Sequence, residues 1–327
     1  MILAGDIGGT NTRLALVEAT TGEMVIAAEK TFPSRERTSL EAAIGEFLSF
    51  HSCDLTGASF GIAGPVRNGR CEATNLPWVV DAKAVAKRLR LKRVGLINDL
   101  EANAYGLAVL QNKDFVILNQ GARNARGNKA IISAGTGLGE AGMYWDGEIH
   151  RPFASEGGHV DFAPRNQIEM ELLDYSLNHF RRVSYERLVS GPGLVNVYSF
   201  LRDTGKGEEP AWLAEQMRHG DPAPIISQNA LEGKSPLCLR ALDLFVSIYG
   251  AEAGNLALTL MATGGVYLGG GIAPKIVSKL KDPEFMNAFT AKGRMRPLLQ
   301  DIPVKVIMNP KTALLGAARH AVLELGK

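Results

Sequence analysis

A glycine-rich turn near the start of the sequence has the residue types needed to hold phosphate groups. It follows a short apolar run and precedes a second apolar run, so it joins two expected strands. Its residues are Gly5, Asp6, Ile7, Gly8, Gly9 and Thr10. Glycines let backbone amides approach phosphoryl oxygens without interference from a Cβ. Asp6 can hold magnesium, directly or through water, because hard cations prefer oxygen ligands. Taken alone, the turn also fits an ordinary β-hairpin rich in Gly and Thr.

Two further glycine clusters occupy similar positions after β-like runs. The second is formed by Gly135, Thr136 and Gly137, the third by Gly269, Gly270 and Gly271. The second cluster continues into a hairpin turned by Asp146-Gly147, as the first does through Thr21-Gly22. This parallel indicates a weak internal duplication. Three glycine turns that follow three strands can surround one nucleotide, and we expect a helix opened by Pro274 after the third.

Other nucleotide-binding motifs do not fit. The second cluster has the spacing GxGxG and leads into a strand, whereas a dinucleotide fingerprint has GxGxxG and opens a helix. A Walker A sequence is absent, and so are the HRD and DFG pairs of protein kinases. A nucleotide would therefore be held by a different fold.

The pair Asn98-Asp99 lies where a buried strand is expected to end and a helix to begin. Open α/β sheets bind ligands at the carboxyl ends of their strands. From position alone, Asp99 is an ordinary helix cap. Its functional interpretation is a base that accepts a substrate hydroxyl proton, with the helix N-terminus keeping it ionised and weakly basic. Phosphoryl transfer suits such a base, because it requires an aligned nucleophile more than early proton abstraction.

A second polar cluster follows the second hairpin. Glu156 and His159 bracket two glycines, so both side chains can converge on one small molecule from a tight loop. With Glu186 they provide donors and acceptors suited to several vicinal hydroxyls. Each also has a structural alternative: a lone histidine is often structural, and Glu186 fits the first turn of a helix behind Ser184.

Composition is that of an ordinary water-soluble protein. The 327 residues suggest about two domains, and the net charge of +2 indicates neither a nucleic-acid surface nor a membrane patch. Three widely spaced cysteines without a CxxC favour reduced thiols in the cytoplasm and no zinc site. The start has no basic leader typical of a signal peptide. Residues 255–274 are uncharged, but their glycines favour a buried helix and strand over a membrane span.

The apolar patterns predict alternating strands and helices, hence an α/β fold. A polar stretch at 206–233 is expected to be a surface insertion of short helices. The strands are expected at 59–63, 93–97, 115–118, 130–132 and 141–145, and the helices at 39–50, 100–110 and 236–261, with a further basic helix ending at Arg90 and capped by Asp81.

Nine segments together resemble bacterial glucokinases of the type that lacks a zinc motif. They are GDIGGTNTRLAL, FGIAGPV, TNLPW, LINDLEANAYGL, SAGTGLGEAG, SEGGHVDFAP, YERLVSGPGL, LGGGIAPKI and the last helix around Leu314 to Ala318. The resemblance covers nearly the whole chain. It implies membership of the sugar kinase, actin and Hsp70 superfamily, with two related ribonuclease-H-like α/β domains that close over a sugar and ATP with Mg²⁺. Their expected extents are 1–110 plus 300–327 for the small domain and 111–299 for the large one.

The resemblance also implies roles for individual residues. Asp99 would be the base for the 6-hydroxyl of glucose, and Asn98 would bind nearby hydroxyls. Glu156, His159 and Glu186 would hold the remaining ring hydroxyls. The first glycine turn would face the ATP phosphates with Asp6 toward magnesium, the second would lie near the transferred phosphate, and the third near adenosine. A cytoplasmic homodimer is the implied assembly.

Two alternatives to glucose phosphorylation remain open at the level of sequence. One is a kinase of another hexose such as mannose, fructose or an N-acetylhexosamine, because the sequence does not supply the geometry that selects a sugar. The other is a non-catalytic sugar sensor on the same fold, which would need a DNA-binding extension, and none is expected ahead of residue 1. Oligomeric state, domain closure and regulation are not fixed by the sequence.

Overall fold

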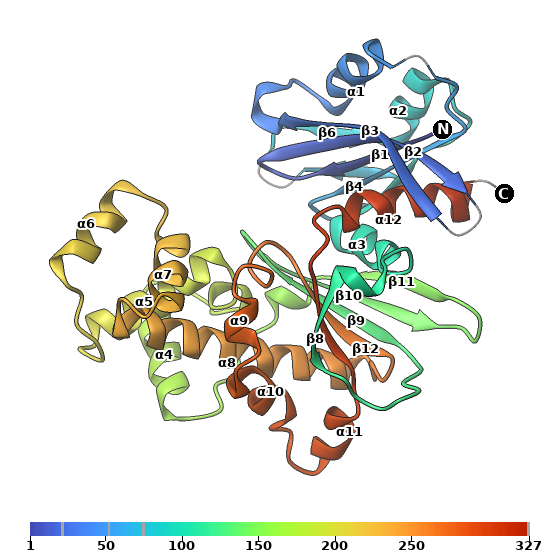
Figure 1. Cartoon of the computed structure of the whole chain (residues 1–327). Helices are drawn as coiled ribbons and strands as arrows, with labels where there is room; N and C mark the ends of the chain where they lie inside the picture. Colours follow the sequence, from blue (N-terminus) through green and yellow to red (C-terminus); the bar gives the residue numbers. More distant parts are fainter. Residues whose placement is uncertain (21–22, 52, 74–75, 326–327) are drawn as a thin grey trace. The chain divides into compact units, whose positions relative to one another are not determined.

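The computed structural model describes residues 1–20, 23–51, 53–73 and 76–325. Two compact units make up the chain (Figure 1). The first contains Met1–Asp114, Arg151–Ala154 and Asn309–Lys327, and the second contains Phe115–His150 and Ser155–Met308. The expected Thr21-Gly22 turn lies outside the described residues. In the part of the chain that the structure describes, no helix has the length and apolar character needed to cross a membrane.

The first unit contains a five-stranded sheet with the order β3-β2-β1-β4-β7. Strands β1, β4 and β7 are parallel, while β2 and β3 run antiparallel to their neighbours. The strands of this unit are β1 Ile2–Ile7, β2 Asn11–Thr20, β3 Glu23–Pro33, β4 Gly57–Ile62, β5 Arg70–Glu72, β6 Val79–Asp81 and β7 Gly95–Asn98. Its helical segments are η1 Ser34–Glu36, α1 Leu40–Ser49, α2 Ala82–Leu89, α3 Asp99–Gly106, η2 Asn112–Asp114, α12 Thr312–His320 and η6 Ala321–Leu325, the last a π turn.

Both faces of the first sheet are covered by helices. Along β1 and β2, alternate side chains enter two separate apolar clusters, as the period of two in a strand requires. Leu3 and Leu14 pack with α1 and α2, whereas Ala4 and Ala15 pack with α12. Coverage on both faces explains why these strands read as nearly continuous apolar runs.

A six-stranded sheet with the order β11-β10-β9-β12-β13-β8 belongs to the second unit, except that Arg151–Ala154 of its edge strand β11 are grouped with the first. Here β9, β12 and β13 are parallel, and β10 is antiparallel to β9. The strands are β8 Phe115–Asn119, β9 Lys129–Ala134, β10 Leu138–Trp145, β11 His150–Ser155, β12 Gly265–Gly269 and β13 Val304–Ile307. The helical segments are η3 Gly157–His159, α4 Gln167–Leu177, η4 Tyr185–Arg187, α5 Gly191–Asp203, α6 Ala211–His219, α7 Pro222–Leu231, α8 Pro236–Thr259, α9 Val277–Leu280, α10 Pro283–Thr290, η5 Gly293–Met295 and α11 Arg296–Gln300.

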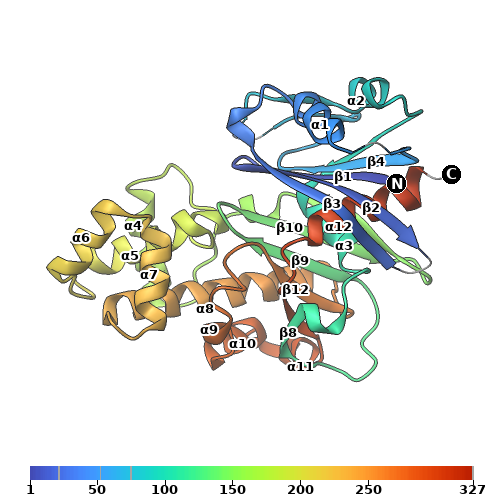
Figure 2. The same ribbon diagram turned by 45° about the horizontal axis from the view of Figure 1, so that its top comes forward.

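The long helix α8 organises the core of the second unit. It contacts β9 and β12 of the sheet and the helices α5, α7 and α10 (Figure 2). Phe245, Ile248 and Tyr249 on this helix are fully buried. The polar stretch 206–233 forms the short helices α6 and α7, also as predicted.

The two sheets repeat one topology. The order β3-β2-β1-β4-β7 in the first sheet corresponds to β11-β10-β9-β12-β13 in the second, and β8 is an additional edge strand. This repeated order confirms the internal duplication and the predicted α/β fold of two related ribonuclease-H-like domains.

Two predicted helix boundaries are wrong. The helix after the third glycine turn begins at Val277 and not at Pro274, because the amides of Lys275 and Ile276 both bond to the carbonyl of Ile272 and close a turn first. Helix α3 ends at Gly106 and not at Leu110, since the amide of Val109 bonds to the carbonyl of Gly106 in a tighter turn.

Candidate active site

The first glycine turn is a tight connection between β1 and β2. The amide of Gly8 donates to the carbonyl of Asn11 at 2.9 Å. Ser34 fixes the turn from the side, because its hydroxyl donates to the carbonyl of Gly8 at 2.8 Å and lies 2.9 Å from the hydroxyl of Thr12. Both hydroxyls are buried. The backbone of this turn is therefore held by the protein and does not depend on a ligand for its shape.

Asp6 lies at the end of β1, beside this turn. Its side chain is half-buried, and in the part of the chain that the structure describes its carboxylate accepts no hydrogen bond. Burial raises the pKa of Asp6, and the nearby charge of Arg13 acts in the opposite direction. A half-buried carboxylate without hydrogen-bond donors gains most from a cation, so the residues present fit a magnesium ion.

The Asn98-Asp99 pair lies at the same edge of the first sheet. In the parallel register, Ile7 is opposite Ile62 and Ile62 is opposite Asn98. The carboxyl ends of β1, β4 and β7 therefore lie side by side, which places Asp6 and Asp99 at one sheet edge. Ligands of α/β proteins bind at this edge.

Asn98, and not Asp99, is the cap of helix α3, which corrects the structural alternative offered from sequence. The side chain of Asn98 accepts from the amide of Leu100 at 2.8 Å and donates to the carbonyl of Gly64 at 3.2 Å. Asp99 is the first helical residue, and one of its oxygens also accepts from Leu100 at 3.0 Å. Because Asn98 already accepts from the Leu100 amide, the helix does not need Asp99 as its cap. A carboxylate has several acceptor sites, so Asp99 can accept further hydrogen bonds from a ligand.

The second and third glycine turns lie next to each other in the second unit. Gly269 pairs with Ser133 in the parallel register of β12 and β9. Gly270 has a φ of +80°, and a Cβ there would lie 2.3 Å from the carbonyl oxygen of Ala134. Only glycine fits such a position without displacing backbone. A Cβ at Gly271, in contrast, would meet nothing within 4 Å, so the third turn has open space on this side.

Glu156, His159 and Glu186 come together as the sequence predicts. Glu156 precedes η3, His159 ends it, and Glu186 is the middle residue of η4. The imidazole lies between the two carboxylates, with Nε2 4.0 Å from Glu156 and Nδ1 4.0 Å from Glu186. These separations are too long for hydrogen bonds and leave the polar atoms available to a ligand. Glu186 also lies in the first turn of a helical segment behind Ser184, as the structural alternative predicted, and this segment is a short 3-10 helix.

Glu186 also connects this cluster to the second glycine turn. One oxygen accepts from the amide of Leu138 at 3.0 Å, and a Cβ at Gly137 would lie 2.5 Å from the same oxygen. The absence of a side chain at Gly137 is therefore what admits Glu186 to the turn. A change at either residue is expected to move the other.

Sequence reasoning missed the residues that hold η3 and η4 together. Arg182 donates to the carbonyl of His159 at 2.5 Å and to the carboxylate of Asp161 at 2.9 Å. Backbone bonds add to this connection, from Tyr185 to Val160 at 3.1 Å among others. Asp161 stood within the predicted motif, but nothing in the sequence paired it with an arginine. A hollow of about 390 Å³ lies beside the cluster, with both His159 and Glu186 in its lining.

No group of three or more metal-ligating side chains occurs in the described ranges, and the three cysteines, all of them described, are free. The magnesium expectation therefore depends on Asp6 alone, with water and phosphate oxygens completing any coordination shell. This arrangement is typical of magnesium in phosphoryl-transfer sites, where few ligands come from the protein.

Comparisons with known proteins agree with these observations. The glucokinase family model matches residues 3–324. A glucokinase from Trichormus variabilis is 42% identical over 334 residues, covering 97% of this chain and 98% of its own length. The crystal structure of a glucokinase from an Antarctic psychrotroph superposes with a TM-score of 0.86 at 31% identity, covering 98% of each chain. A ROK family glucokinase from Streptomyces griseus, crystallised with glucose and AMPPNP, shares the fold with a TM-score of 0.66 at 22% identity, covering 98% of this chain and 99% of that one. The chain belongs to the glucokinase family.

Proposed function

We propose that this hexose kinase transfers the γ-phosphoryl group of ATP to the 6-hydroxyl of D-glucose and forms glucose 6-phosphate. The observation that carries the proposal is the common sheet edge of Asp6 and Asp99, which puts a carboxylate suited to a metal and one suited to a base next to one glycine turn. The names of the relatives and the glucose and AMPPNP ligands of the Streptomyces griseus structure support the same substrates.

In the proposed reaction, Asp99 accepts the proton of the 6-hydroxyl as its oxygen attacks the γ-phosphorus. The bond between this phosphorus and the β,γ-bridging oxygen breaks, and ADP leaves. Asn98 binds a neighbouring hydroxyl and fixes the sugar next to the base. General-base assistance of this kind supplies about 10²- to 10⁴-fold in rate.

The remaining groups position the substrates. Glu156, His159 and Glu186 accept and donate hydrogen bonds to the other ring hydroxyls. We assign the phosphates of ATP to the turn at 5–10 and to Gly135, Thr136 and Gly137, and the adenosine side to Gly269, Gly270 and Gly271. Asp6 would hold Mg²⁺ directly or through water, and the ion when bound neutralises charge on the β- and γ-phosphates.

We also propose that the two units act as the small and large domains of the enzyme, and that the protein is a cytoplasmic homodimer. The free state of all three cysteines is compatible with a reducing compartment. Sedimentation of the purified protein measures the assembly directly, and a monomer over the working concentration range would remove that part of the proposal.

Asp99→Ala and Asp99→Asn test the central role. Both variants should bind glucose within about threefold of wild type by calorimetry, because Asp99 is one of several polar partners of the sugar. Their kcat should fall by about 10²- to 10⁴-fold. Lys83→Ala, a substitution of an exposed residue on α2, is the control variant and should keep wild-type kcat and glucose binding. Undiminished turnover in either Asp99 variant would remove the proposed base.

A panel of sugars separates glucose from the remaining candidates. Glucose, mannose, fructose and N-acetylglucosamine are compared by kcat/KM in one coupled assay. A site built to hydrogen-bond particular hydroxyls rejects analogues that lack them by large factors. A higher kcat/KM for any of the other three would reassign the substrate while leaving the kinase chemistry intact.

A further inference from the structure

Two buried glutamates lie behind the sugar-binding cluster and have no part in the proposed chemistry. Glu140 is in β10 and is 2% exposed, and Glu252 is in α8 and is 3% exposed. Their carboxyl groups lie close enough to interact directly, and each affects the pKa of the other. Two adjacent buried carboxylates would repel each other if both were ionised, and a hydrogen bond between them needs a proton on one of them. At least one of the two is therefore protonated.

The surroundings of the two carboxyl groups determine where the proton resides. Glu252 accepts from the side-chain amide nitrogen of Asn255 at 2.9 Å, and this nitrogen also lies 3.0 Å from the hydroxyl of Tyr185. One oxygen of Glu140, in contrast, is buried with no hydrogen-bond partner. A charge is better tolerated on the solvated or hydrogen-bonded group, so Glu252 is the anion and Glu140 is the neutral acid that donates to it.

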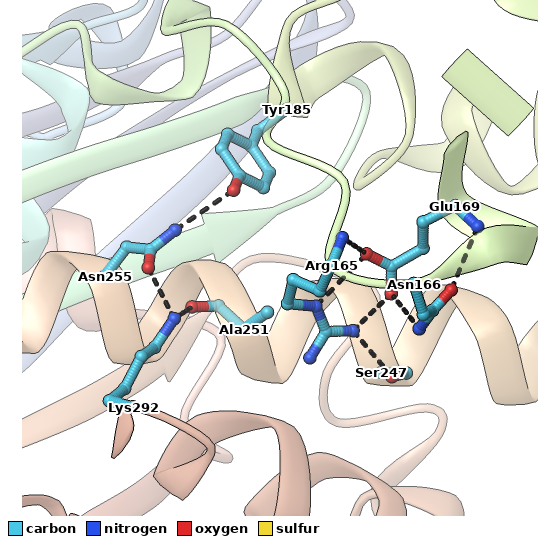
Figure 3. A network of polar contacts seen from close by, with 8 residues as sticks. All are labelled: Arg165, Asn166, Glu169, Tyr185, Ser247, Ala251, Asn255 and Lys292. Carbon is cyan, nitrogen blue, oxygen red and sulfur yellow. Dashed lines mark hydrogen bonds and ion pairs between the residues drawn. The ribbon is translucent and has the colours of Figure 1, made fainter. Parts of the chain in front are cut away.

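Lys292 belongs to the network of polar contacts around Asn255 (Figure 3). It donates to the carbonyl of Ala251 at 2.9 Å and also to the side-chain oxygen of Asn255, which turns the Asn255 nitrogen toward Tyr185 at 3.0 Å. On the same helix α8, Ser247 bonds to the neighbouring Arg165. The titratable groups facing the pair are Tyr185, Tyr249 and Lys292, with the Arg165–Glu169 ion pair next to Lys292.

Both segments that carry the sugar-binding side chains are supported by this pair. Gly157, the first residue of η3, lies so close to Glu140 that a Cβ there would be 1.9 Å from its Oε2. Tyr185, the first residue of η4, accepts through its hydroxyl from the side-chain amide of Asn255 at 3.0 Å, and the same amide donates to Glu252 at 2.9 Å. His159 ends the first segment and Glu186 follows Tyr185 in the second. One buried contact therefore lies beneath two of the three sugar-binding groups.

We propose that the buried pair Glu140–Glu252 is a positioning element for sugar binding, which sets the spacing of η3 and η4 only while one proton is shared between its carboxyl groups. The proposal rests on the assignment of Glu156, His159 and Glu186 to the sugar. Loss of the shared proton places two negative charges in contact inside the core, which drives Glu140 and Glu252 apart. The segments at Gly157 and Tyr185 then move with them.

The pair makes glucose affinity sensitive to alkaline pH. Burial, with the charge of Glu252 adding to it, raises the pKa of Glu140 to about 8. If only the protonated form binds glucose, the KM for glucose should rise by about tenfold between pH 7 and pH 9. kcat at saturating glucose should change far less, because bound sugar favours the protonated form. Glu140→Gln keeps the size and a donor toward Glu252 but cannot ionise, so its KM should stay flat over the same range.

Steady-state kinetics of wild type, Glu140→Gln, Glu140→Ala and Glu232→Gln from pH 6.5 to 9 test this proposal. Glu232 is an exposed glutamate after α7, and its replacement should leave the wild-type pH profile unchanged. Glu140→Ala should raise the KM for glucose about tenfold already at pH 7, with kcat changed less than about threefold. A Glu140→Gln variant whose KM still rises like that of wild type, or a Glu140→Ala variant with wild-type KM, would overturn the proposal.

Gly157→Ala provides a second variant if Glu140→Ala does not fold. It leaves the pair in place and displaces only η3 from Glu140, so the KM for glucose should rise at every pH, with kcat largely retained. An unchanged KM would mean that the Gly157 contact does not position the sugar site.

Hydrogen exchange of the sugar-free protein at pH 7 separates this inference from the proposed function. The amides of 155–160 and 184–188 should exchange about tenfold faster in Glu140→Ala, or in Gly157→Ala for the first segment, than in wild type, with Glu140→Gln close to wild type. Equal exchange in all variants would contradict the positioning role, whatever sugar the enzyme uses. Failure of wild type to phosphorylate glucose would contradict the proposed substrate, and the exchange comparison would still decide the role of the pair.

Discussion

The two sheets share a strand order, but they place different chemistry at equivalent positions. The first sheet carries two carboxylates at its strand ends, Asp6 near the end of β1 and Asp99 directly after β7. The second sheet ends in glycine turns after β9 and β12, where a side chain would strike backbone at Gly270. In the second sheet, Glu186 of the proposed sugar-binding cluster reaches the glycine turn. The two sheets thus share a topology but differ in the residues at their strand ends, which are carboxylates in the first and glycines in the second.

This difference leads to a kinetic expectation. Changes at Asp6 and Asp99 of the first unit should lower kcat, because these carboxylates are proposed to act on the reacting atoms. Changes in the second unit should mainly raise KM, because its groups are proposed to hold the substrates before and during reaction. Variants of the first unit that changed mainly KM, or variants of the second unit that changed mainly kcat, would contradict this expectation.

Asp6→Asn is expected to have the largest effect among these further variants. The amide keeps the size but loses the negative charge that a magnesium ion requires. We expect kcat to fall by about 10²- to 10³-fold, with the KM for glucose within about threefold of wild type. Titration of activity with MgCl₂ should show a higher half-saturating concentration in the variant. Equal magnesium curves for the two proteins would exclude Asp6 as a contact of the ion.

Glu186→Gln should affect both substrates. The change removes a charge beside His159 and weakens the acceptor of the Leu138 amide. We expect the KM for glucose to rise by about 30-fold and the KM for ATP by a smaller factor, with kcat reduced only a few fold. Glu171→Gln, a change at a half-buried glutamate on α4 that is paired with Lys206, is the matched control. A rise confined to one substrate would show that the glycine turn and the sugar cluster are independent.

Stability should fall with rising pH because of Glu140. Its pKa is raised from 4.5 to about 8 in the folded protein, so the folded state holds a proton that the unfolded state releases between these values. The contribution of this group is fully present below pH 4.5 and is lost as the pH rises to about 8. Relative to Glu140→Gln, wild type should lose up to about 1.4 kcal/mol per pH unit in this window. Parallel urea denaturation curves of the two proteins at pH 5, 6 and 7 measure the loss, and equal pH slopes would contradict the assignment.

Ser34→Ala should have the smallest effect of the series. The change removes the hydrogen bond to Gly8 and the contact with Thr12, which together fix the first glycine turn. We expect kcat to fall by about three- to fivefold and the KM for glucose to stay the same. A larger change in the KM for glucose than in kcat would contradict the proposed role of the first turn in holding the ATP phosphates.

Motifs confined to short segments were predictable from the sequence. The glycine turns, the Asp81 cap of α2, the long helix α8 and the convergence of Glu156, His159 and Glu186 all follow from local spacing or from the resemblance it carries. Each depends on residues that are close in the chain or that lie at recognisable strand ends, where topology brings them together.

Features that depend on tertiary contacts were not predictable. Asn98 and Asp99 are equally good caps by type, and it is the extended backbone of Asn98, with its side chain accepting from the Leu100 amide, that shows which residue takes the role. The Glu140–Glu252 pair joins a strand to a distant helix. Its one signal in the sequence was a glutamate in each of two apolar stretches, which identifies buried charge but not its partner.

A structure with glucose and a non-hydrolysable ATP analogue tests the central claim most directly. The distance between the Asp99 carboxylate and the 6-hydroxyl oxygen of glucose is the decisive quantity. The account predicts hydrogen-bond contact, at about 2.6 to 3.2 Å, with the same hydroxyl oxygen facing the γ-phosphorus. A sugar seated with its 6-hydroxyl on another group, and Asp99 out of reach of every hydroxyl, would contradict it.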